Sequence, residues 1–301
     1  MTNSRYKTPD AMEMAVKAAA KASSQDTNQA LLDYYHDRFL SRIFSEDDPR
    51  FILKGGRGML ARLVDVRRTR DTDIFYSGDD IGEAVDELVR LGGKELGDFL
   101  TYRLESIEVI VEEQGYRSGK RLRFTPVLGG TKEIRPHVVI DLVVDPAVAI
   151  CPDVVDPVNS LAVKGIDTPR YLVFPVVNSI ADKVVATMLP YPNGSRSSRV
   201  KDLVDLVRYV LSEELIGDRL HEAVRSEFCL RGAAIPEAFS IPDSWGRELL
   251  KGYQKLAKEA RLPKACFDVE YARGMVACCL DPALLGDCVG RVWSPERLRW
   301  E

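Results

Sequence analysis

The sequence predicts an α+β protein, in which a mixed β-sheet flanked by helices precedes a helical C-terminal domain. Apolar or alternating runs of strand length recur between residues 51 and 174, with Gly- and Pro-containing turns between them. From about residue 170 onward, the apolar residues recur at helical spacing instead. We therefore expect N-terminal helices that pack on the core over residues 1–48, a sheet-containing core over 49–170 and a mainly helical domain over 171–301.

Two helices are predicted before the sheet begins. Residues 9–23 are rich in alanine and methionine, and they contain no helix breaker after Pro9. Residues 27–45 carry apolar side chains at four-residue intervals, namely Leu31, Tyr35, Phe39 and Ile43. Since this spacing places these side chains on one face, we expect the second helix to pack on the core, with His36 on its polar face.

The first candidate site lies in a pattern of strand, glycine turn, helix and strand. The apolar run Phe51-Ile52-Leu53 is typical of a buried strand, and Gly55 and Gly56 follow it after Lys54. Consecutive glycines let backbone N–H groups approach a ligand closely, because no Cβ atom stands in the way. A short helical segment leads to Asp71-Thr72-Asp73 and a second apolar run. A glycine turn near paired carboxylates is what nucleotidyl transfer needs, since the turn can hold a triphosphate.

Asp71 and Asp73 are separated by a single residue. If both lie on the strand, its two-residue period puts their side chains on the same face. Adjacent carboxylates repel each other, and a divalent cation between them relieves the repulsion; oxygen ligands of this kind suit Mg²⁺ or Mn²⁺. The alternative is an ordinary pair of surface carboxylates, because two aspartates at this spacing are common on protein surfaces.

A third carboxylate, Asp141, lies in the apolar and β-branched strand predicted at Arg135–Val144. A carboxylate in such a run is costly to bury without a partner. Asp141 is therefore either a third catalytic carboxylate beside Asp71 and Asp73 or an exposed residue at the edge of the sheet.

The remaining elements follow from the same two periodicities. Between the first site and the Asp141 strand, we expect a helix to about Leu91 and strands at Ser106–Glu112 and Arg121–Leu128. After a last strand at Tyr171–Phe174, we expect helices at Val176–Leu189, Ser198–Ser212, 217–228, 245–260 and 268–280.

The second candidate site lies on two of these later helices. Lys183 is in the first of them, and Asp202 and Asp205 in the second are three residues apart, so they share a helical face. The alternative is a charged and solvated helix face.

Composition and charge exclude several classes of protein. The formal net charge of −4 argues against a generally basic nucleic-acid binder, but arginines and lysines crowd around the glycine turn and favour a polyanionic substrate. The six cysteines form no CxxC pair, and no histidine adjoins a nucleophile, so zinc sites and nucleophilic triads lack support. We see no signal peptide and no apolar run that approaches a membrane span, and we expect a cytoplasmic protein.

The ordered set of apolar strand, Gly55-Gly56, helix and Asp71-Thr72-Asp73 resembles the signature of polymerase-beta-like nucleotidyltransferases. With Lys183 and the later Lys201–Leu206 segment, the pattern resembles the AbiEii/MenT nucleotidyltransferase toxins of type IV toxin–antitoxin systems. The chain departs from the family pattern in a slightly long spacer, in the polar Thr72, and in Arg57, where relatives have a small hydroxyl residue.

The resemblance implies roles for these residues. Asp71, Asp73 and Asp141 would bind a divalent metal, and Lys183 would contact the nucleotide phosphates. Asp205 would orient Lys183, although the sequence leaves open whether Asp202 takes that role. The expected nucleotide-binding residues are Lys54, Gly55, Gly56, Arg57, Thr69 and Lys183.

The resemblance also implies an activity. We expect metal-dependent transfer of a nucleoside monophosphate from an NTP to an RNA 3′ end, with release of pyrophosphate. The expected acceptor is the acceptor stem of tRNA, so that transfer blocks translation, and the expected protein partner is a cognate antitoxin. The alternatives are transfer to a protein or small-molecule hydroxyl, or a nucleotide-binding module without catalysis.

Overall fold

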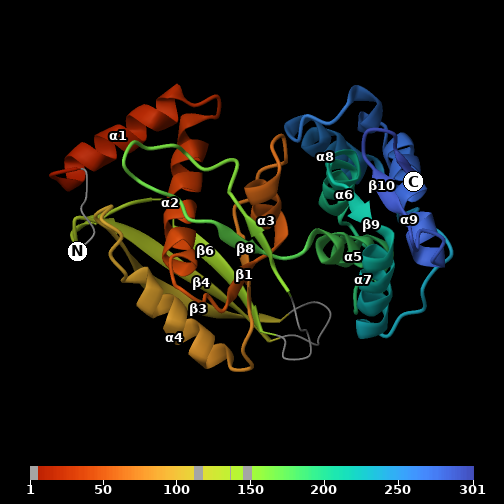
Figure 1. Ribbon diagram of the computed structural model, residues 1–301, viewed down its shortest axis with the longest axis horizontal. Helices are drawn as coiled ribbons and strands as arrows, with labels where there is room; N and C mark the ends of the chain where they lie inside the picture. Colours follow the sequence, from red (N-terminus) through yellow and green to blue (C-terminus); the bar gives the residue numbers. More distant parts are fainter. Residues whose placement is uncertain (1–5, 112–117, 136, 145–150) are drawn as a thin grey trace. The chain divides into compact units, whose positions relative to one another are not determined.

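The computed structural model describes residues 6–111, 118–135, 137–144 and 151–301 (Figure 1). These residues fall into two compact units, of which the first ends at Phe174 and the second begins at Pro175. The short segment Asp65–Arg68 clusters with the second unit, although it lies between elements of the first in the sequence.

A mixed sheet forms the centre of the first unit. Its strands among the described residues are β1 Phe51–Leu53, β2 Thr72–Tyr76, β3 Leu100–Val111, β4 Ser118–Leu128, β5 Lys132–Glu133, β6 Val138–Val144, β7 Asp153–Val155 and β8 Tyr171–Val173. The order is β3-β4-β6-β2-β1-β8-β7, with β5 paired to β4. The pairs β2/β6 and β1/β8 are parallel, and the other pairs are antiparallel. The predicted α+β class with a mixed sheet is confirmed.

Helices cover one face of this sheet. The helices of the unit are α1 Pro9–Ala22, α2 Thr27–Phe44, α3 Gly55–Arg62 and α4 Ile81–Gly92. α2 and α4 pack on the strands and α1 packs on α2 (Figure 1). Along β6 every second residue, from Val138 to Val144, is buried, so the residues between them lie on the opposite face. Asp141 is one of these.

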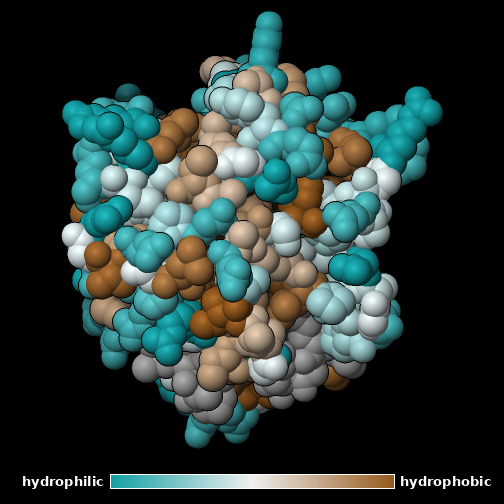
Figure 2. Space-filling view, turned by 90° about the vertical axis from the view of Figure 1, so that its right-hand side faces the viewer, coloured by the Kyte–Doolittle hydropathy of each residue, from teal (hydrophilic) through white to brown (hydrophobic). Residues whose placement is uncertain are grey.

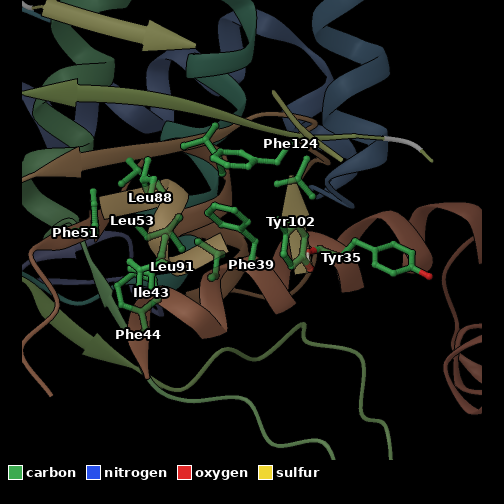
Figure 3. Packing of buried hydrophobic residues seen from close by; sticks show 14 of the residues in the cluster. Tyr35, Phe39, Ile43, Phe44, Phe51, Leu53, Leu88, Leu91, Tyr102 and Phe124 are labelled. Atoms are coloured by element: carbon green, nitrogen blue, oxygen red, sulfur yellow. Dashed lines mark hydrogen bonds between the residues drawn. The ribbon is translucent and has the colours of Figure 1, made fainter. Parts of the chain in front are cut away.

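Aromatic and aliphatic side chains fill the space between the helices and the sheet (Figure 3). Phe39 of α2 lies with its ring centroid 4.8 Å from that of Phe124 on β4 and 5.0 Å from that of Tyr102 on β3. Leu88 of α4 belongs to the same cluster. This packing fixes the sheet on its helical side.

The burial of α2 is more extensive than its apolar stripe predicts. His36 is 1% exposed, so the prediction that it lies on the polar face is wrong. Arg38 and Arg42 are also buried, and both donate hydrogen bonds to the buried carboxylate of Asp98. These ionic and polar contacts let charged residues enter the core, because each charge has a partner there.

The second unit is mainly helical. Its elements are α5 Val176–Met188, α6 Val200–Ser212, α7 Gly217–Leu230, α8 Arg247–Glu259, a 3₁₀ turn at Lys264–Phe267 and α9 Val269–Leu285. A small sheet of β9 Leu215–Ile216, β10 Val292–Ser294 and β11 Arg299–Trp300 accompanies them. Trp293 on β10 is fully buried and donates a hydrogen bond to the carbonyl oxygen of Val210 on α6, which fastens the C-terminal strands to the helices.

Apolar residues on the surface occur as separate patches among hydrophilic residues on the face shown in Figure 2. In the described part of the chain, none of the helices combines the length and the apolar character that crossing a bilayer requires.

Candidate active site

The glycine turn lies directly against the second aspartate of the first candidate site. Gly55 begins α3 with φ +61°, and a Cβ atom placed there would be 1.9 Å from Asp73 Oδ2. The backbone N–H of Lys54 donates to the Asp73 carbonyl oxygen over 2.8 Å. A Cβ atom on Gly56 would be 3.0 Å from Thr69 Cβ and 3.2 Å from its Oγ1. Only glycine at position 55 permits this approach, because a side chain would meet the carboxylate and require a strained backbone.

The first turn of α3 can receive an anion. Lys54 is the N-cap of this helix, and its side chain makes no capping hydrogen bond to the N–H groups that follow. The first N–H groups of a helix have no partner within the helix, and together with the helix dipole they attract phosphate. The ammonium group of Lys54 is 4.4 Å from the centroid of the Phe174 ring.

Charged residues form a row across four neighbouring strands, on the face opposite the helices. Asp73 on β2 is the register partner of Asp141 on β6. Asp141 is in turn the partner of Arg121 on β4, which is the partner of Glu108 on β3. Asp71, which is exposed, lies just before β2. The structure therefore places Asp73 and Asp141 side by side.

Arg121 occupies both carboxylate oxygens of Asp141. Its Nε donates to Oδ1 and its terminal NH₂ to Oδ2, each over 2.7 Å. The hydrogen bond and charge of Asp141, together with the charge of Asp71, raise the pKa of Arg121 above its ordinary value. The sequence indicated Arg121 as a member of a basic stretch and as the start of a strand, but not as the partner of Asp141, because cross-strand register is not visible in the spacing of residues.

The predicted metal ligands are Asp71, Asp73 and Asp141. Among the residues described, no group of three or more His, Cys, Asp or Glu side chains is arranged to hold a metal ion. Asp141, one of these residues, is paired with Arg121. The donors themselves fit Mg²⁺ or Mn²⁺, since they are carboxylates and the glycine turn leaves Asp73 Oδ2 unobstructed by a Cβ atom.

Thr72, the polar residue between the aspartates, faces the helical side of the sheet. It is fully buried, and its Oγ1 is 2.8 Å from Nδ1 of His36 on α2. Nε2 of His36 is buried and has no hydrogen-bond partner among the described residues. Burial, and next the charge of Arg57, hold the pKa of His36 well below its ordinary value, so the ring is neutral. The departure from an apolar residue at position 72 is thus explained by a hydrogen bond to α2.

Arg57 points towards α2 and is only 3% exposed. Its guanidinium is 3.2 Å from an Asp33 oxygen and 3.9 Å from an Asp37 oxygen. Burial raises the pKa of Asp37 to about 6, although the charge of Arg57 opposes this. The geometry therefore gives no support to the predicted contact of Arg57 with a triphosphate, and it assigns the residue to an ion pair that fastens α3 to α2.

The second candidate site is a buried cluster in the second unit. Lys183 on α5 donates to Asp205 over 2.8 Å and to Asp202 over 3.2 Å, both on α6. Arg67 grips Asp205 with two further hydrogen bonds of 2.9 and 2.8 Å. The pairing of Arg67 with Asp205 was not predicted. No local pattern in the sequence could have shown it, because the two residues are 138 positions apart.

Electrostatics keep Lys183 and Asp205 ionised. Burial alone would lower the pKa of Lys183, but the charges of Asp205 and Asp202 outweigh it, and the pKa is raised above its ordinary value. Burial alone would raise the pKa of Asp205, but the charges of Lys183 and Arg67 lower it. Asp205 therefore holds two cations in place, whereas Asp202 receives the longer of the two bonds from Lys183.

Comparison with known proteins identifies the family. The family described as "Nucleotidyl transferase AbiEii toxin, Type IV TA system" matches residues 38–264. The chain belongs to the AbiEii family. The resemblance drawn from the glycine turn, the aspartate pair and the later lysine and aspartates is thereby confirmed at the level of the family. An AbiEii protein is a nucleotidyltransferase toxin, and its type IV system includes an antitoxin.

This chain is similar to several solved structures at low sequence identity. MenT4, a nucleotidyltransferase toxin of Mycobacterium tuberculosis H37Rv, is 16% identical with a TM-score of 0.49, over 96% of this chain and 99% of that one. JHP933 of Helicobacter pylori is 13% identical with a TM-score of 0.43, over 86% of this chain and 94% of that one. No curated protein matches the sequence. The assignment rests on the AbiEii match.

Proposed function

We propose that this AbiEii protein transfers a nucleoside monophosphate from an NTP to the 3′ end of tRNA and thereby blocks translation. The observation that carries the proposal is the position of Asp73, which lies against the Gly55 turn on one side and opposite Asp141 on the other. In this arrangement the turn would bind the triphosphate, and a carboxylate beside it would accept the proton of the acceptor hydroxyl.

The nucleotide is held by groups of the turn and by cations. The N–H groups at Gly55 and Gly56 receive triphosphate oxygens, with the Thr69 hydroxyl beside Gly56 and the Lys54 ammonium as further donors. The resemblance to the family assigns phosphate binding to Lys183, and Asp205 orients its ammonium group through the 2.8 Å hydrogen bond.

Catalysis consists of positioning and of stabilising charge. Asp71 and Asp73, joined by Asp141, would hold Mg²⁺ or Mn²⁺, which when bound stabilises the negative charge that develops on the α-phosphate. Asp141 accepts the proton of the 3′-hydroxyl, whose oxygen attacks the α-phosphorus. The bond from that phosphorus to the bridging oxygen breaks, and pyrophosphate leaves.

The tRNA acceptor and the cellular role are proposed from the resemblance to the family. A tRNA with nucleotides added to its 3′ end cannot be aminoacylated, and this accounts for toxicity in the cytoplasm. The antitoxin of the type IV system counters that effect.

Mass analysis of tRNA tests this function. Purified protein is incubated with deacylated tRNA, Mg²⁺ and each NTP in turn, and the tRNA is weighed by mass spectrometry. We expect a gain of one or more nucleotide masses, which is lost in Asp73→Asn and kept in Asp79→Asn, an exposed aspartate beyond the same strand. Unchanged tRNA with every NTP would contradict the proposal. Transfer of the nucleotide to a protein or to a small hydroxyl compound would mean that tRNA is not the acceptor.

A further inference from the structure

Asp141 has two register partners on its face of the sheet, a carboxylate on one neighbouring strand and a guanidinium on the other. The neighbouring strand β2 presents Asp73 in register with it, which is the geometry of two metal ligands. The other neighbour, β4, presents Arg121 in register, and both oxygens of Asp141 accept hydrogen bonds from it. A carboxylate held in this bidentate way gives one lone pair of each oxygen to the guanidinium, and the positive charge of the guanidinium disfavours a cation at the lone pairs that remain.

Arg121 can leave Asp141 for another partner. The Arg121 side chain is 41% exposed, while that of Asp141 is 14% exposed. Ion pairs that water reaches are weak and do not hold their geometry against a better ligand. A guanidinium released from Asp141 would stay beside any metal at Asp73 and repel it, unless an anion arrives to receive the guanidinium. A phosphate oxygen pair matches the guanidinium fork as well as a carboxylate does.

We propose that Arg121 is a positioning residue that holds Asp141 until an NTP arrives, and that it thereby makes divalent-metal binding depend on the nucleotide. The inference rests on the proposed function and adds a regulation of that site. With NTP bound, Arg121 moves from Asp141 to the phosphates, and Asp141 becomes a ligand beside Asp73. Metal and nucleotide then bind cooperatively, and each strengthens the other by the same factor.

The chain offers a matched control for this idea. Arg123 is two residues further along β4 on the same face, but its register partner on β6 is Val139. Arg123→Gln removes the same charge from the same surface without freeing a carboxylate. Arg121→Lys keeps the charge of Arg121 but loses the fork that occupies both oxygens.

The test is direct measurement of Mn²⁺ binding by electron paramagnetic resonance, with and without each α,β-methylene nucleoside triphosphate. Without nucleotide, we expect Arg121→Gln to bind Mn²⁺ at least about fivefold more tightly than the unaltered protein, which is the lower end of typical couplings between sites. Arg121→Lys should lie between the two. The nucleotide analogue should tighten Mn²⁺ binding strongly in the unaltered protein and at least about fivefold less in Arg121→Gln.

Several outcomes overturn the inference. Equal or weaker Mn²⁺ binding in Arg121→Gln would do so, and so would equal tightening in Arg123→Gln, which would assign the effect to net charge. Circular dichroism is used to check that each variant is folded. Failure of the underlying function is distinguishable, because Mn²⁺ would then bind in no condition, or as tightly in Asp73→Asn as in the unaltered protein.

Discussion

Asp73 and Asp141 are register partners on the neighbouring parallel strands β2 and β6, and their side chains lie on the face opposite α2 and α4. Parallel strands bring residues together that are far apart in the sequence, and here they bring together the two carboxylates on which the proposed chemistry depends. The glycine turn completes this arrangement, because Gly55 has no side chain to separate it from Asp73.

Gly55→Ala should abolish nucleotidyl transfer. The new Cβ atom would lie 1.9 Å from Asp73 Oδ2, so the carboxylate must move, and the φ of +61° adds strain of about 1–3 kcal/mol. The control is Gly194→Ala, where φ is +80° but nothing lies within 4 Å, so it carries the backbone strain without the collision. Transfer rates and urea unfolding of both variants check this. Equal activity in the two variants would show that the turn does not set the position of Asp73.

Asp205→Asn should destabilise the protein more than Asp202→Asn. Asp205 accepts hydrogen bonds from both Lys183 and Arg67, and it is 1% exposed. Removing one member of a buried ion pair costs about 3–5 kcal/mol, because the remaining charges lose their partner. Asp202 receives the longer bond from Lys183 and lies 3.5 Å from the partly exposed Arg199 guanidinium, so its loss should cost less. The free energy of unfolding in urea measures both, and the reverse order would make Asp202 the principal partner of Lys183.

His36 should make the stability depend on pH. Its folded-state pKa lies well below the ordinary 6.5, because the ring is buried. The unfolded chain therefore binds the proton first, so the stability from neutral His36 is fully present above pH 6.5 and falls as the pH drops towards the folded pKa. The slope is about 1.4 kcal/mol per pH unit.

The comparison of unaltered protein with His36→Gln isolates this effect. Asp37, whose pKa is raised to about 6, changes stability in the opposite direction over an overlapping range, but it is present in both proteins and cancels. The advantage of the unaltered protein over His36→Gln in unfolding free energy should shrink from pH 7 to pH 5. A constant difference would mean that His36 is not held neutral.

Arg57→Leu should lower stability without weakening NTP binding. The guanidinium is buried between Asp33 and Asp37, and its loss leaves both carboxylates without their cation at a cost of about 3 kcal/mol. KM for NTP, measured well below the unfolding temperature, should stay within about twofold of the unaltered value, because Arg57 is buried against α2. A twofold change corresponds to less than half a kcal/mol of binding energy. A tenfold rise in KM at unchanged stability would return Arg57 to the nucleotide site.

The local parts of the fold could be predicted from the sequence. The strand at Phe51–Leu53, the glycine turn and the approach of the turn to Asp73 are encoded within about twenty residues, where period and spacing are informative. The position of Asp141 beside Asp73 was also predictable, because a carboxylate within an apolar strand needs a reason. The helical character of the chain after residue 175 followed from its periodicity.

The remaining features depend on tertiary pairing. The polar residue His36 lies in the core because Thr72 meets it there, and no sequence pattern on α2 shows that partner. Arg121 takes both oxygens of Asp141 because the register of β4 against β6 places it there. The small sheet of β9, β10 and β11 was not predicted, since strands of two or three residues have too few positions to show alternation.

Label transfer from [α-³²P]NTP to tRNA tests the central claim most directly, namely that Asp73 and the glycine turn form a nucleotidyl-transfer site. The reaction contains Mg²⁺, and EDTA, Asp73→Asn and Asp79→Asn are run beside it. We predict label at the tRNA 3′ end with at least one NTP, lost with EDTA and reduced at least about a hundredfold in Asp73→Asn, as removal of a group that stabilises the transition state does. Label transfer by Asp73→Asn at the rate of Asp79→Asn would contradict the account.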